Sequence, residues 1–488
     1  MRRSFPRSEQ SFQSVSPSSR GCAGRSSGDT SMPDLIPSCR LPRPSSRSPG
    51  DTFLHRRQFL GTGLAIAACS GDDARRSMVA LHPCPRPSLA ARLAMIDGAT
   101  EQINVAYYSV DGGRAASTIL HALVVAADRG VQVRVILDGL KSRLNESLLR
   151  YLSRRNVAVR IYHPPCALRP FRWNRRYHGK LIVADRHVAM FGSRNLEDAH
   201  FALDTDKTFV DSDVLVHGSP VGDASAFFNH LWQSCEVESP RTGGVDFGCG
   251  ETDEGFAAGW RRVRTMKDAE RKLVSVAADI RGVLPDPTAA GRFEIDAALW
   301  RDCSIDKFCG CFMGRVLRLI DSGRRSIVVE SPYPAFGPEI ESSLLSAARR
   351  GVAVTLLTNS LRSTDQINVY AAYQNRKRRL IRAGVRLREY AGDAVLHAKT
   401  IVVDGRRAMV GSYNFDTRSD RLNLELGVYA DDPVWASAVA VGVRRRMSSS
   451  VSTDRRSVPL SVGPDVSMHR RAKMAWGRAI APVCRKHY

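Results

Sequence analysis

Two stretches of the sequence follow one pattern: HGKLIVADRHVAMFGSRN at residues 178–195 and HAKTIVVDGRRAMVGSYN at residues 397–414. Both have the form HxKxxxxDxxxxxxGSxN. The apolar residues after each lysine predict a strand, and a turn at the aspartate followed by a second strand would return the Gly-Ser-x-Asn loop beside the histidine. Because side chains alternate across a strand, the histidine and lysine are expected on one face. Each stretch thus predicts a cluster of an imidazole, an ammonium, a hydroxyl and an amide.

The segments around these stretches repeat one another in the same order. Each half has a helix and a strand, then a helix that stops at a glycine, Gly130 or Gly351, and then a strand, a basic helix and a further strand. The matching segments are 93–97 and 317–321, 103–107 and 327–330, 133–137 and 354–357, and 148–155 and 376–382. This rhythm predicts an α/β fold with one mixed, largely buried sheet per half, helices on both faces, and a pseudo-twofold relation between the halves.

The repeat and the composition divide the chain into six expected segments. These are a disordered leader with an export and lipoprotein signal at 1–68, a linker at 69–89, the first half at 90–235, a connecting insertion at 236–312, the second half at 313–440 and a basic tail at 441–488.

The motif residues suit phosphoryl transfer without a metal or a cofactor. A neutral imidazole can attack phosphorus, and cations and hydrogen-bond donors can neutralise the equatorial oxygens. A second, protonated imidazole can give a proton to the leaving alkoxide. One half supplies only one histidine, so both halves are needed in one site.

The charge balance indicates an anionic partner. The chain has 72 Lys and Arg against 49 Asp and Glu, a formal charge of +23, which fits either nucleic acid or acidic lipid headgroups. Part of the excess lies in the Ser/Arg-rich start and in the tail, where solvated and partly disordered ends are an equal interpretation. The tail cations are Arg444, Arg445, Arg446, Arg470, Arg471 and Lys473.

An export signal is indicated near residue 60. Arg56-Arg57 with Phe59-Leu60 resembles a twin-arginine signal, and residues 66–69, Ile-Ala-Ala-Cys, resemble a lipobox that would leave an acylated Cys69. The apolar run is too short to span a bilayer. A buried core helix with an incidental cysteine is the alternative. The long stretch before Arg56 counts against an export signal unless translation begins later, for example at Met32.

Cysteine usage fits an oxidising compartment. With Cys22 and Cys39 removed and Cys69 lipidated, eight cysteines remain, an even number that permits disulfides. Three of them crowd one segment without a CxxC pair or an associated histidine, so a disulfide is favoured there over a metal. They are Cys303, Cys309 and Cys311.

The paired motif resembles that of the phospholipase D superfamily, over about residues 90–435. The resemblance implies that His178 and His397 face each other between the halves, His178 as nucleophile and His397 as general acid and base. It implies that the phosphate oxygens are bound by Lys180, Lys399, Asn195 and Asn414. The motif serines and aspartates would support the loops and brace the fold, respectively; they are Ser193 and Ser412, and Asp185 and Asp404.

Each imidazole also needs an acceptor for its other nitrogen, which fixes the tautomer and stabilises the imidazolium. Asp211 and Glu425 occupy matching places after the two motifs. The resemblance implies that each serves the opposite half, Asp211 for His397 and Glu425 for His178. Asp213 is an alternative to Asp211.

Local likenesses are to bacterial cardiolipin synthases, particularly the C type. The segments that carry them are 174–178, 209–218, 357–361 with Thr364-Asp365, and 414–419. Two features depart from that group: Ser193 stands where those enzymes often have a second glycine, and no apolar stretch long enough for a transmembrane helix precedes the first half. An acylated Cys69 could supply membrane attachment instead.

The resemblance implies transfer of a phosphatidyl group from phosphatidylglycerol or phosphatidylethanolamine, through a phosphohistidine, to a lipid hydroxyl. Water as acceptor would make a phospholipase D hydrolase, and a nuclease is a third possibility, disfavoured because nuclease relatives tend to be short chains with one motif. An idle lipid-binding protein is disfavoured because no motif position is lost. With both motifs in one chain, no obligate oligomer is expected. The expected location is the periplasmic side of a bacterial membrane.

Overall fold

A computed structural model describes residues 77–142, 144–165, 170–203, 208–240, 263–282, 284–285, 292–302, 310–453 and 467–480. The chain divides into two units, Met1–Ser38 and Cys39–Tyr488, and every described residue belongs to the second. The expected leader, the twin-arginine pair and the lipobox with Cys69 lie outside the described residues. Among the residues that are described, none of the helices combines the length and the apolar character that crossing a membrane requires.

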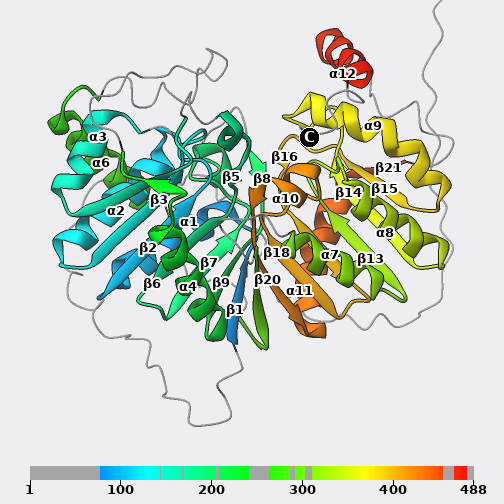
Figure 1. Cartoon of the computed structure of the whole chain (residues 1–488), viewed down its shortest axis with the longest axis horizontal. Helices are drawn as coiled ribbons and strands as arrows, with labels where there is room; N and C mark the ends of the chain where they lie inside the picture. The colour runs from blue at the N-terminus through cyan, green and yellow to red at the C-terminus, as the bar shows by residue number, and fades with distance from the viewer. Residues whose placement is uncertain are drawn as a thin grey trace, which may run out of the picture. The chain divides into compact units, whose positions relative to one another are not determined.

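The first half is built on a sheet that has nine strands in the described residues, in the order β10-β4-β3-β2-β6-β7-β9-β1-β11 (Figure 1). Strands β2, β3 and β4 run parallel, and β6 pairs antiparallel with β2. Their bounds are β1 Ser77–His82, β2 Gln102–Tyr107, β3 Gln132–Asp138, β4 Val157–Tyr162, β6 Lys180–Ala184, β7 Val188–Gly192, β9 Asp213–His217, β10 Val237–Glu238 and β11 Arg292–Ile295.

The second half repeats this plan. Its eight described strands have the order β12-β20-β18-β17-β13-β14-β15-β21, which reproduces the first sheet from β1 to β10 strand for strand. Both the duplication and the α/β class with two mixed sheets are therefore confirmed. The bounds are β12 Ala297–Arg301, β13 Ser326–Glu330, β14 Ala353–Asn359, β15 Arg386–Tyr390, β17 Thr400–Val403, β18 Arg407–Gly411, β20 Leu426–Asp431 and β21 Ser450–Thr453.

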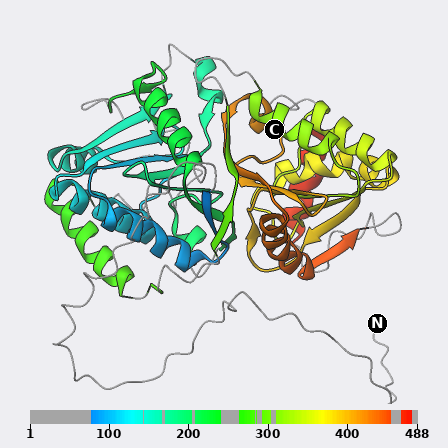
Figure 2. The same cartoon turned by 90° about the horizontal axis from the view of Figure 1, so that it is seen from below.

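Helices cover both faces of each sheet (Figure 2). In the first half these are α1 Pro85–Gly98, α2 Arg114–Asp128, α3 Glu146–Arg154 and α6 Met266–Arg281 on one face, and α4 Ser219–Gln233 on the other. In the second half they are α7 Cys311–Asp321, α8 Pro338–Arg349 and α9 Ile367–Arg382 on one face, and α11 Pro433–Ser448 on the other. Helix α2 shows the reason: ten of the 15 residues in its sequence RAASTILHALVVAAD are Ala, Val, Ile or Leu, and most of the helix is buried against the sheet and α6.

The two halves share one hydrophobic core. Phe191 and Val214 of the first sheet pack in the same cluster as Val410 and Val428 of the second, and Trp435 of α11 is wholly buried there. Strand β7 contacts β18 and β20 directly, and β9 contacts β18. Burial of this much apolar surface between the sheets fixes the halves against each other.

The predicted boundaries of the first half are wrong at both ends. Residues 77–89 were expected in a linker, but β1 lies between β9 and β11, with Val79 fully buried. The repeated sequence pattern starts at residue 93, after β1, and therefore did not predict that strand. The described parts of the expected insertion at 236–312 also belong to the two halves: α6 packs on α2, β11 joins the first sheet and β12 the second, so the chain crosses between sheets at Asp296.

The tail is likewise part of the fold as far as it is described. Helix α11 continues to Ser448, β21 pairs with β15, and α12 (Met468–Ile480) packs against α9. Arg446, one of the tail cations interpreted as either a solvated end or part of an anion-binding patch, is instead buried and paired with Glu330, with Nη2 lying 2.7 Å from Oε2. A buried carboxylate needs such a partner, and a charge pattern alone does not reveal it.

Candidate active site

Short parallel ladders exchanged between the halves hold the two histidines. Strand β5 (Arg176–Tyr177) pairs with β19 (Asn423–Leu424), and β8 (Phe209–Val210) pairs with β16 (Val395–Leu396). The ladders continue into the motifs, because the His178 amide donates to the Leu424 carbonyl at 3.0 Å and the His397 amide to the Val210 carbonyl at 2.8 Å. The residues after Leu424 and Val210 are Glu425 and Asp211. Each ladder thus sets a histidine beside an acid of the other half.

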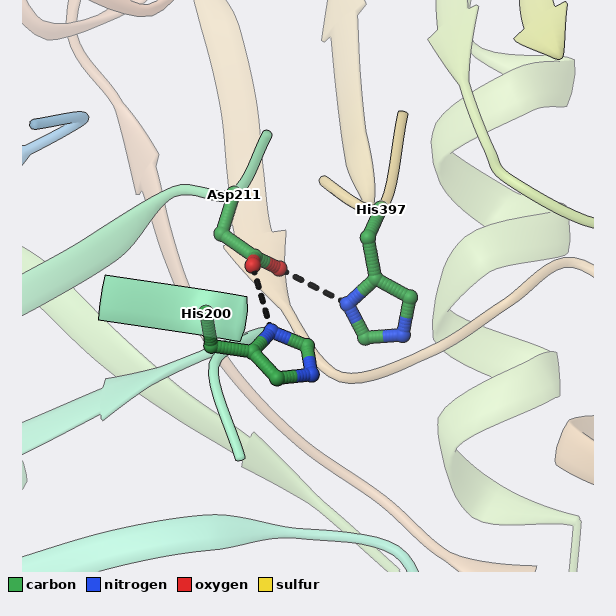
Figure 3. Close-up of side chains that lie close together, drawn as sticks. All are labelled: His200, Asp211 and His397. Atoms are coloured by element: carbon green, nitrogen blue, oxygen red, sulfur yellow. Dashed lines mark hydrogen bonds and ion pairs between the residues drawn. The ribbon is translucent and has the colours of Figure 1, made fainter. Parts of the chain in front are cut away.

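The side chains complete this pairing. His178 Nδ1 lies 2.9 Å from Glu425 Oε2, and His397 Nδ1 lies 2.7 Å from Asp211 Oδ1 (Figure 3). Both carboxylates are fully buried. The neighbouring acid Asp213 is not the partner of His397, since it accepts hydrogen bonds from two buried arginines and a serine; they are Arg92, Arg194 and Ser88.

The motif serines act on these acids. Ser193 Oγ donates to Asp211 Oδ1 at 2.6 Å, and Ser412 Oγ donates to Glu425 Oε2. Each Gly-Ser-x-Asn loop therefore fixes the carboxylate that its own half presents to the opposite histidine. A hydroxyl donor also favours the ionised form of the acid that it contacts.

The lysines stand at the start of the strands. Lys180 Nζ donates to the His178 carbonyl at 2.6 Å, and Lys399 Nζ to the His397 carbonyl at 2.5 Å. Strand β6 begins at Lys180 and β17 at Thr400, so the histidines precede the strands. The expectation that each histidine lies in the same strand as its lysine was wrong, because the exchanged ladders hold the histidines instead.

Both imidazoles are poised in the neutral form. Burial, followed by the nearby charges of the lysines, lowers the pKa of His178 and of His397 well below the usual value. Lys399 of the second half acts on His178 of the first, which indicates that the two half-sites form one electrostatic centre. A neutral ring that donates Nδ1–H to a carboxylate leaves Nε2 as a free base, and in Figure 3 the far nitrogen of His397 points away from Asp211.

The charge of Lys180 depends on pH near neutrality. Burial lowers the pKa of Lys180 to about 8, against the opposing charges of Glu425 and Asp211. Burial also lowers the pKa of Lys399 well below its usual range. A phosphodiester anion placed between these groups would favour the charged ammoniums, since an opposite charge stabilises the ionised form.

The two acids differ in ionisation. Burial raises the pKa of Glu425 to about 7, although Lys180 and Ser412 oppose the rise. For Asp211 burial acts in the same direction, but the contacts with His200 and His397 outweigh it and hold the pKa well below the usual value. The half-sites match in their motifs and differ in their electrostatics.

Asn195 and Asn414 offer unused hydrogen-bonding capacity. Both are largely buried, and within the described part of the chain their Oδ1 atoms contact no hydrogen-bond donor. Leaving a buried amide group unpaired is costly. These Oδ1 atoms can accept a hydrogen bond from a donor group of a ligand, whereas the Nδ2 groups are the ones that can donate to phosphate oxygens.

Asp185 and Asp404 brace the fold, at a distance from the histidines. Asp185 accepts from the backbone amides of residues 100–102 at 2.7–2.9 Å, and Asp404 accepts in the same way from residues 324–326. Each follows the far end of the strand that begins at or just after its lysine, β6 or β17, about 16 Å from the lysine along an extended chain.

His200 is a site residue that the sequence motifs do not indicate. Its Nδ1 lies 2.7 Å from Asp211 Oδ2, so one carboxylate serves His200 and His397 (Figure 3). Its Nε2 lies 3.3 Å from Asn195 Nδ2, and its ring stacks on Phe209 with centroids 4.3 Å apart. In the second half Ser419 donates to Glu425 at 2.8 Å in the comparable role. Because the second half has no histidine at the corresponding position, comparing the two halves does not identify His200.

Two tyrosines border the histidines and were also missed. The Tyr108 ring meets His178 edge-on at 4.7 Å and lies 5.0 Å from Lys180 Nζ. The Tyr333 ring lies 6.2 Å from that of His397. Both residues follow the carboxyl ends of parallel strands, β2 and β13, where ligand sites of such sheets gather. Their position just after a parallel strand is the feature of the sequence that could have identified the two tyrosines as site residues.

Among the described residues, one group of side chains could meet on a metal ion: His200, Asp211 and His397, whose ligand atoms lie within 4.8 Å of one another. Both Nδ1 atoms are already hydrogen-bonded to the carboxylate. A metal that used those atoms would have to replace both bonds.

Cys311 is disulfide-bonded, in line with the preference for a disulfide over a metal, while Cys303 and Cys309 lie outside the described residues.

A duplicated α/β scaffold with two histidines, each oriented by an acid of the other half, defines a class of phosphodiester-processing enzymes. The family described as "Cardiolipin synthase, PLD-like domain" matches residues 93–232 and 316–446, more than half of the chain. The chain belongs to this family, and it is a phosphatidyltransferase or phosphodiesterase of the phospholipase D superfamily.

Known proteins agree with this placement. Cardiolipin synthase C of Escherichia coli K12 is 29% identical over 384 residues, which cover 72% of this chain and 81% of that protein. A cardiolipin synthase of Listeria welshimeri is 25% identical, over 70% of this chain and 62% of that protein. The crystal structure of phosphatidylserine synthase from Haemophilus influenzae has a TM-score of 0.59 at 12% identity, over 84% of this chain and 95% of that one. This last likeness concerns the fold alone.

Proposed function

We propose that the chain is a cardiolipin synthase-like phosphatidyltransferase that moves a phosphatidyl group between phospholipids through a covalent phosphatidyl-His178. One observation carries the proposal: two neutral imidazoles, each oriented by a buried acid of the other half, lie in one site with two buried ammoniums. The family match and the relatives whose names include cardiolipin synthase support lipid substrates over nucleic acid.

In the first step His178 Nε2 attacks the phosphorus of the donor lipid. The bond between phosphorus and the headgroup oxygen breaks, and the leaving oxygen takes a proton from His397. His397 becomes charged for this role because ionised Asp211 stabilises an imidazolium and the entering phosphodiester anion offsets its desolvation. The lysines and the asparagine amides bind the equatorial oxygens.

In the second step neutral His397 removes a proton from the acceptor hydroxyl, the acceptor oxygen attacks phosphorus, and the bond to His178 breaks. With phosphatidylglycerol as acceptor the product is cardiolipin. The headgroup released in the first step is glycerol from a phosphatidylglycerol donor or ethanolamine from a phosphatidylethanolamine donor. Water in place of the lipid hydroxyl would give phosphatidic acid from the same intermediate.

Lipid analysis after expression in a bacterial strain devoid of cardiolipin tests this proposal. The wild-type chain is expected to produce cardiolipin, and His178→Ala none. His187→Ala, which changes an exposed histidine of the turn after β6, is the matched control and is expected to behave as wild type. Phosphatidic acid alone would make the chain a hydrolase, whereas neither lipid, together with DNA degradation in vitro, would make it a nuclease.

The proposal includes export and a lipid anchor at Cys69, on the basis of residues 56–69 alone. Radioactive palmitate is expected to label the wild-type chain and not Cys69→Ser, since the thiol is the acceptor that a lipobox offers. Equal labelling of both proteins would remove the anchor from the proposal. Retention of the chain in the cytoplasm when Arg56 and Arg57 are both changed to lysine would support the twin-arginine route.

A further inference from the structure

One face of helix α12 packs against α9 and against the loop that precedes α9. The Arg470 guanidinium donates to the carbonyls of Leu361 at 2.8 Å and Thr364 at 2.6 Å. Met474 packs against the core of the second half, and Gly477 is buried so close to α9 that an added Cβ would meet Ala371 at 3.0 Å. These three α12 residues recur at spacings of four and three, so they form one side of the helix.

The opposite side of α12 is exposed and apolar. Met468 is 79% exposed and Trp476 is 69% exposed, the two highest values among the large apolar residues of the described chain. Ala472 lies between them at the same four-residue spacing and is exposed as well. Lys473 flanks this stripe, and α12 contains no acidic residue. An exposed helix face of tryptophan and methionine beside cations is the composition that enters the headgroup boundary of a bilayer.

Helix α9 extends the surface with positive charge. Its contacts with α12 use Asn368, Ala371 and Asn375, and the same helical stripe continues with Arg378 and Arg382, both exposed. The sequence of α9 has no acidic residue. The apolar stripe and these cations therefore belong to neighbouring parts of one surface, at α12 and α9 in Figure 1.

This surface adjoins the candidate active site. Thr364, which holds Arg470, precedes Asp365, and Asp365 accepts a hydrogen bond from the Tyr333 hydroxyl at 2.7 Å. The Tyr333 ring in turn meets that of His397. A lipid surface against the exposed side of α12 would thus be separated by this one helix from the loop that borders the acid-base histidine.

We propose that the outer face of α12, together with Arg378 and Arg382 of α9, docks onto a bilayer that contains anionic phospholipid and so presents substrate to the site. The proposal rests on the lipid-directed function proposed above. Charge complementarity selects the anionic headgroups, since cations near such a surface are attracted to it. The apolar stripe selects a bilayer over nucleic acid, because a phosphate backbone offers it no apolar boundary to enter.

The test is vesicle flotation of the full chain in a Cys69→Ser background, so that no acyl anchor can mask the contribution of α12. Vesicles of phosphatidylcholine are compared with vesicles that also contain phosphatidylglycerol. The chain is expected to bind the second kind preferentially. Joint Met468→Ser and Trp476→Ser, or joint Lys473→Glu and Arg378→Glu, is expected to weaken that binding at least about tenfold.

Val434→Ser, which removes an exposed apolar residue of α11, is the matched control and is expected to leave binding unchanged. Binding by both α12 variants equal to that of the control would overturn the proposal. The proposal would also be overturned if the wild-type chain bound duplex DNA with comparable affinity and the same variants lost that binding. That result would assign the surface to nucleic acid.

Failure of this proposal is distinguishable from failure of the proposed function. The α12 variants are expected to hydrolyse a water-soluble p-nitrophenyl phosphodiester at the wild-type rate, which also verifies that they fold. His178→Ala is expected to lose that turnover and to keep vesicle binding. Loss of soluble turnover in the α12 variants would overturn a role confined to docking.

Discussion

His397 Nδ1 lies 2.7 Å from Oδ1 of Asp211, an acid supplied by the other half of the molecule. His178 has the corresponding contact with Glu425. Neither half can orient its own histidine in this way, so the two motifs form one site only when the exchanged ladders are in place. The acids nevertheless differ: the pKa of Asp211 is well below its usual value, and that of Glu425 is raised to about 7.

Asp211→Asn is expected to reduce kcat by about 10³-fold, because an amide neither stabilises the His397 imidazolium nor selects the Nδ1–H tautomer. Glu425→Gln is expected to cost less at pH 7, since Glu425 is already partly protonated there. Steady-state rates with a soluble phosphodiester measure both effects. Equal losses at pH 7 would contradict the proposed difference between the acids.

His200→Phe keeps an aromatic ring on Phe209 and removes the second hydrogen bond to Asp211. A hydrogen bond to a charged group contributes about 1.5–3 kcal/mol, so kcat is expected to fall about ten- to a hundredfold with little change in KM. His230→Phe, at an exposed position of α4, is the control. A purely structural role would instead lower the thermal midpoint and leave kcat per folded molecule unchanged.

The sequence predicted the parts of the fold and site that the two halves share. Position-for-position repetition was enough to predict the two sheets and the motif residues, and the resemblance to the phospholipase D superfamily implied that each acid serves the histidine of the opposite half. Site residues without a counterpart in the other half were not predicted. His200 is the example, since Ser419 occupies the comparable place in the second half. The packing of β1, β11 and α12 escaped for a different reason: long-range burial and the carbonyl contacts of Arg470 leave no local pattern.

The ammonium of Lys180 predicts an alkaline limit to activity. Its pKa is lowered to about 8, so the charge that binds phosphate is present below that pH and is lost as the pH rises through it. We expect kcat/KM, which reports the free enzyme, to fall above about pH 8. Lys180→Arg retains its charge there and is expected to move the decline upward. A decline at the same pH in both proteins would assign it to another group.

Chelators are expected to leave turnover unchanged, because imidazoles and ammoniums supply the nucleophile and the charge neutralisation. The expectation concerns one group in particular, because among the described residues the side chains that could meet on a metal ion are His200, Asp211 and His397. Activity is measured after dialysis against EDTA, with and without Zn²⁺ or Mg²⁺ added back. Loss in EDTA that a divalent ion restores would contradict the proposed mechanism.

The division of labour between the two histidines gives the most direct test of the mechanism. An adduct on the nucleophile persists when the second step is blocked, and the partner imidazole is needed to activate the acceptor. With a p-nitrophenyl phosphodiester, whose leaving group needs little protonation, His397→Ala is expected to accumulate a covalent phosphoryl adduct on His178. His178→Ala is expected to accumulate none.

Intact-protein mass spectrometry after quenching without acid would detect the added mass, and peptide mapping would locate it. Lys180 and Lys399 remain in both variants, so binding of the phosphodiester is expected in each and the comparison isolates the nucleophile. An adduct on His397 in the His178→Ala protein would reverse the assignment. Absence of any adduct in both proteins, with turnover retained by wild type, would favour direct displacement by the acceptor over a phosphohistidine.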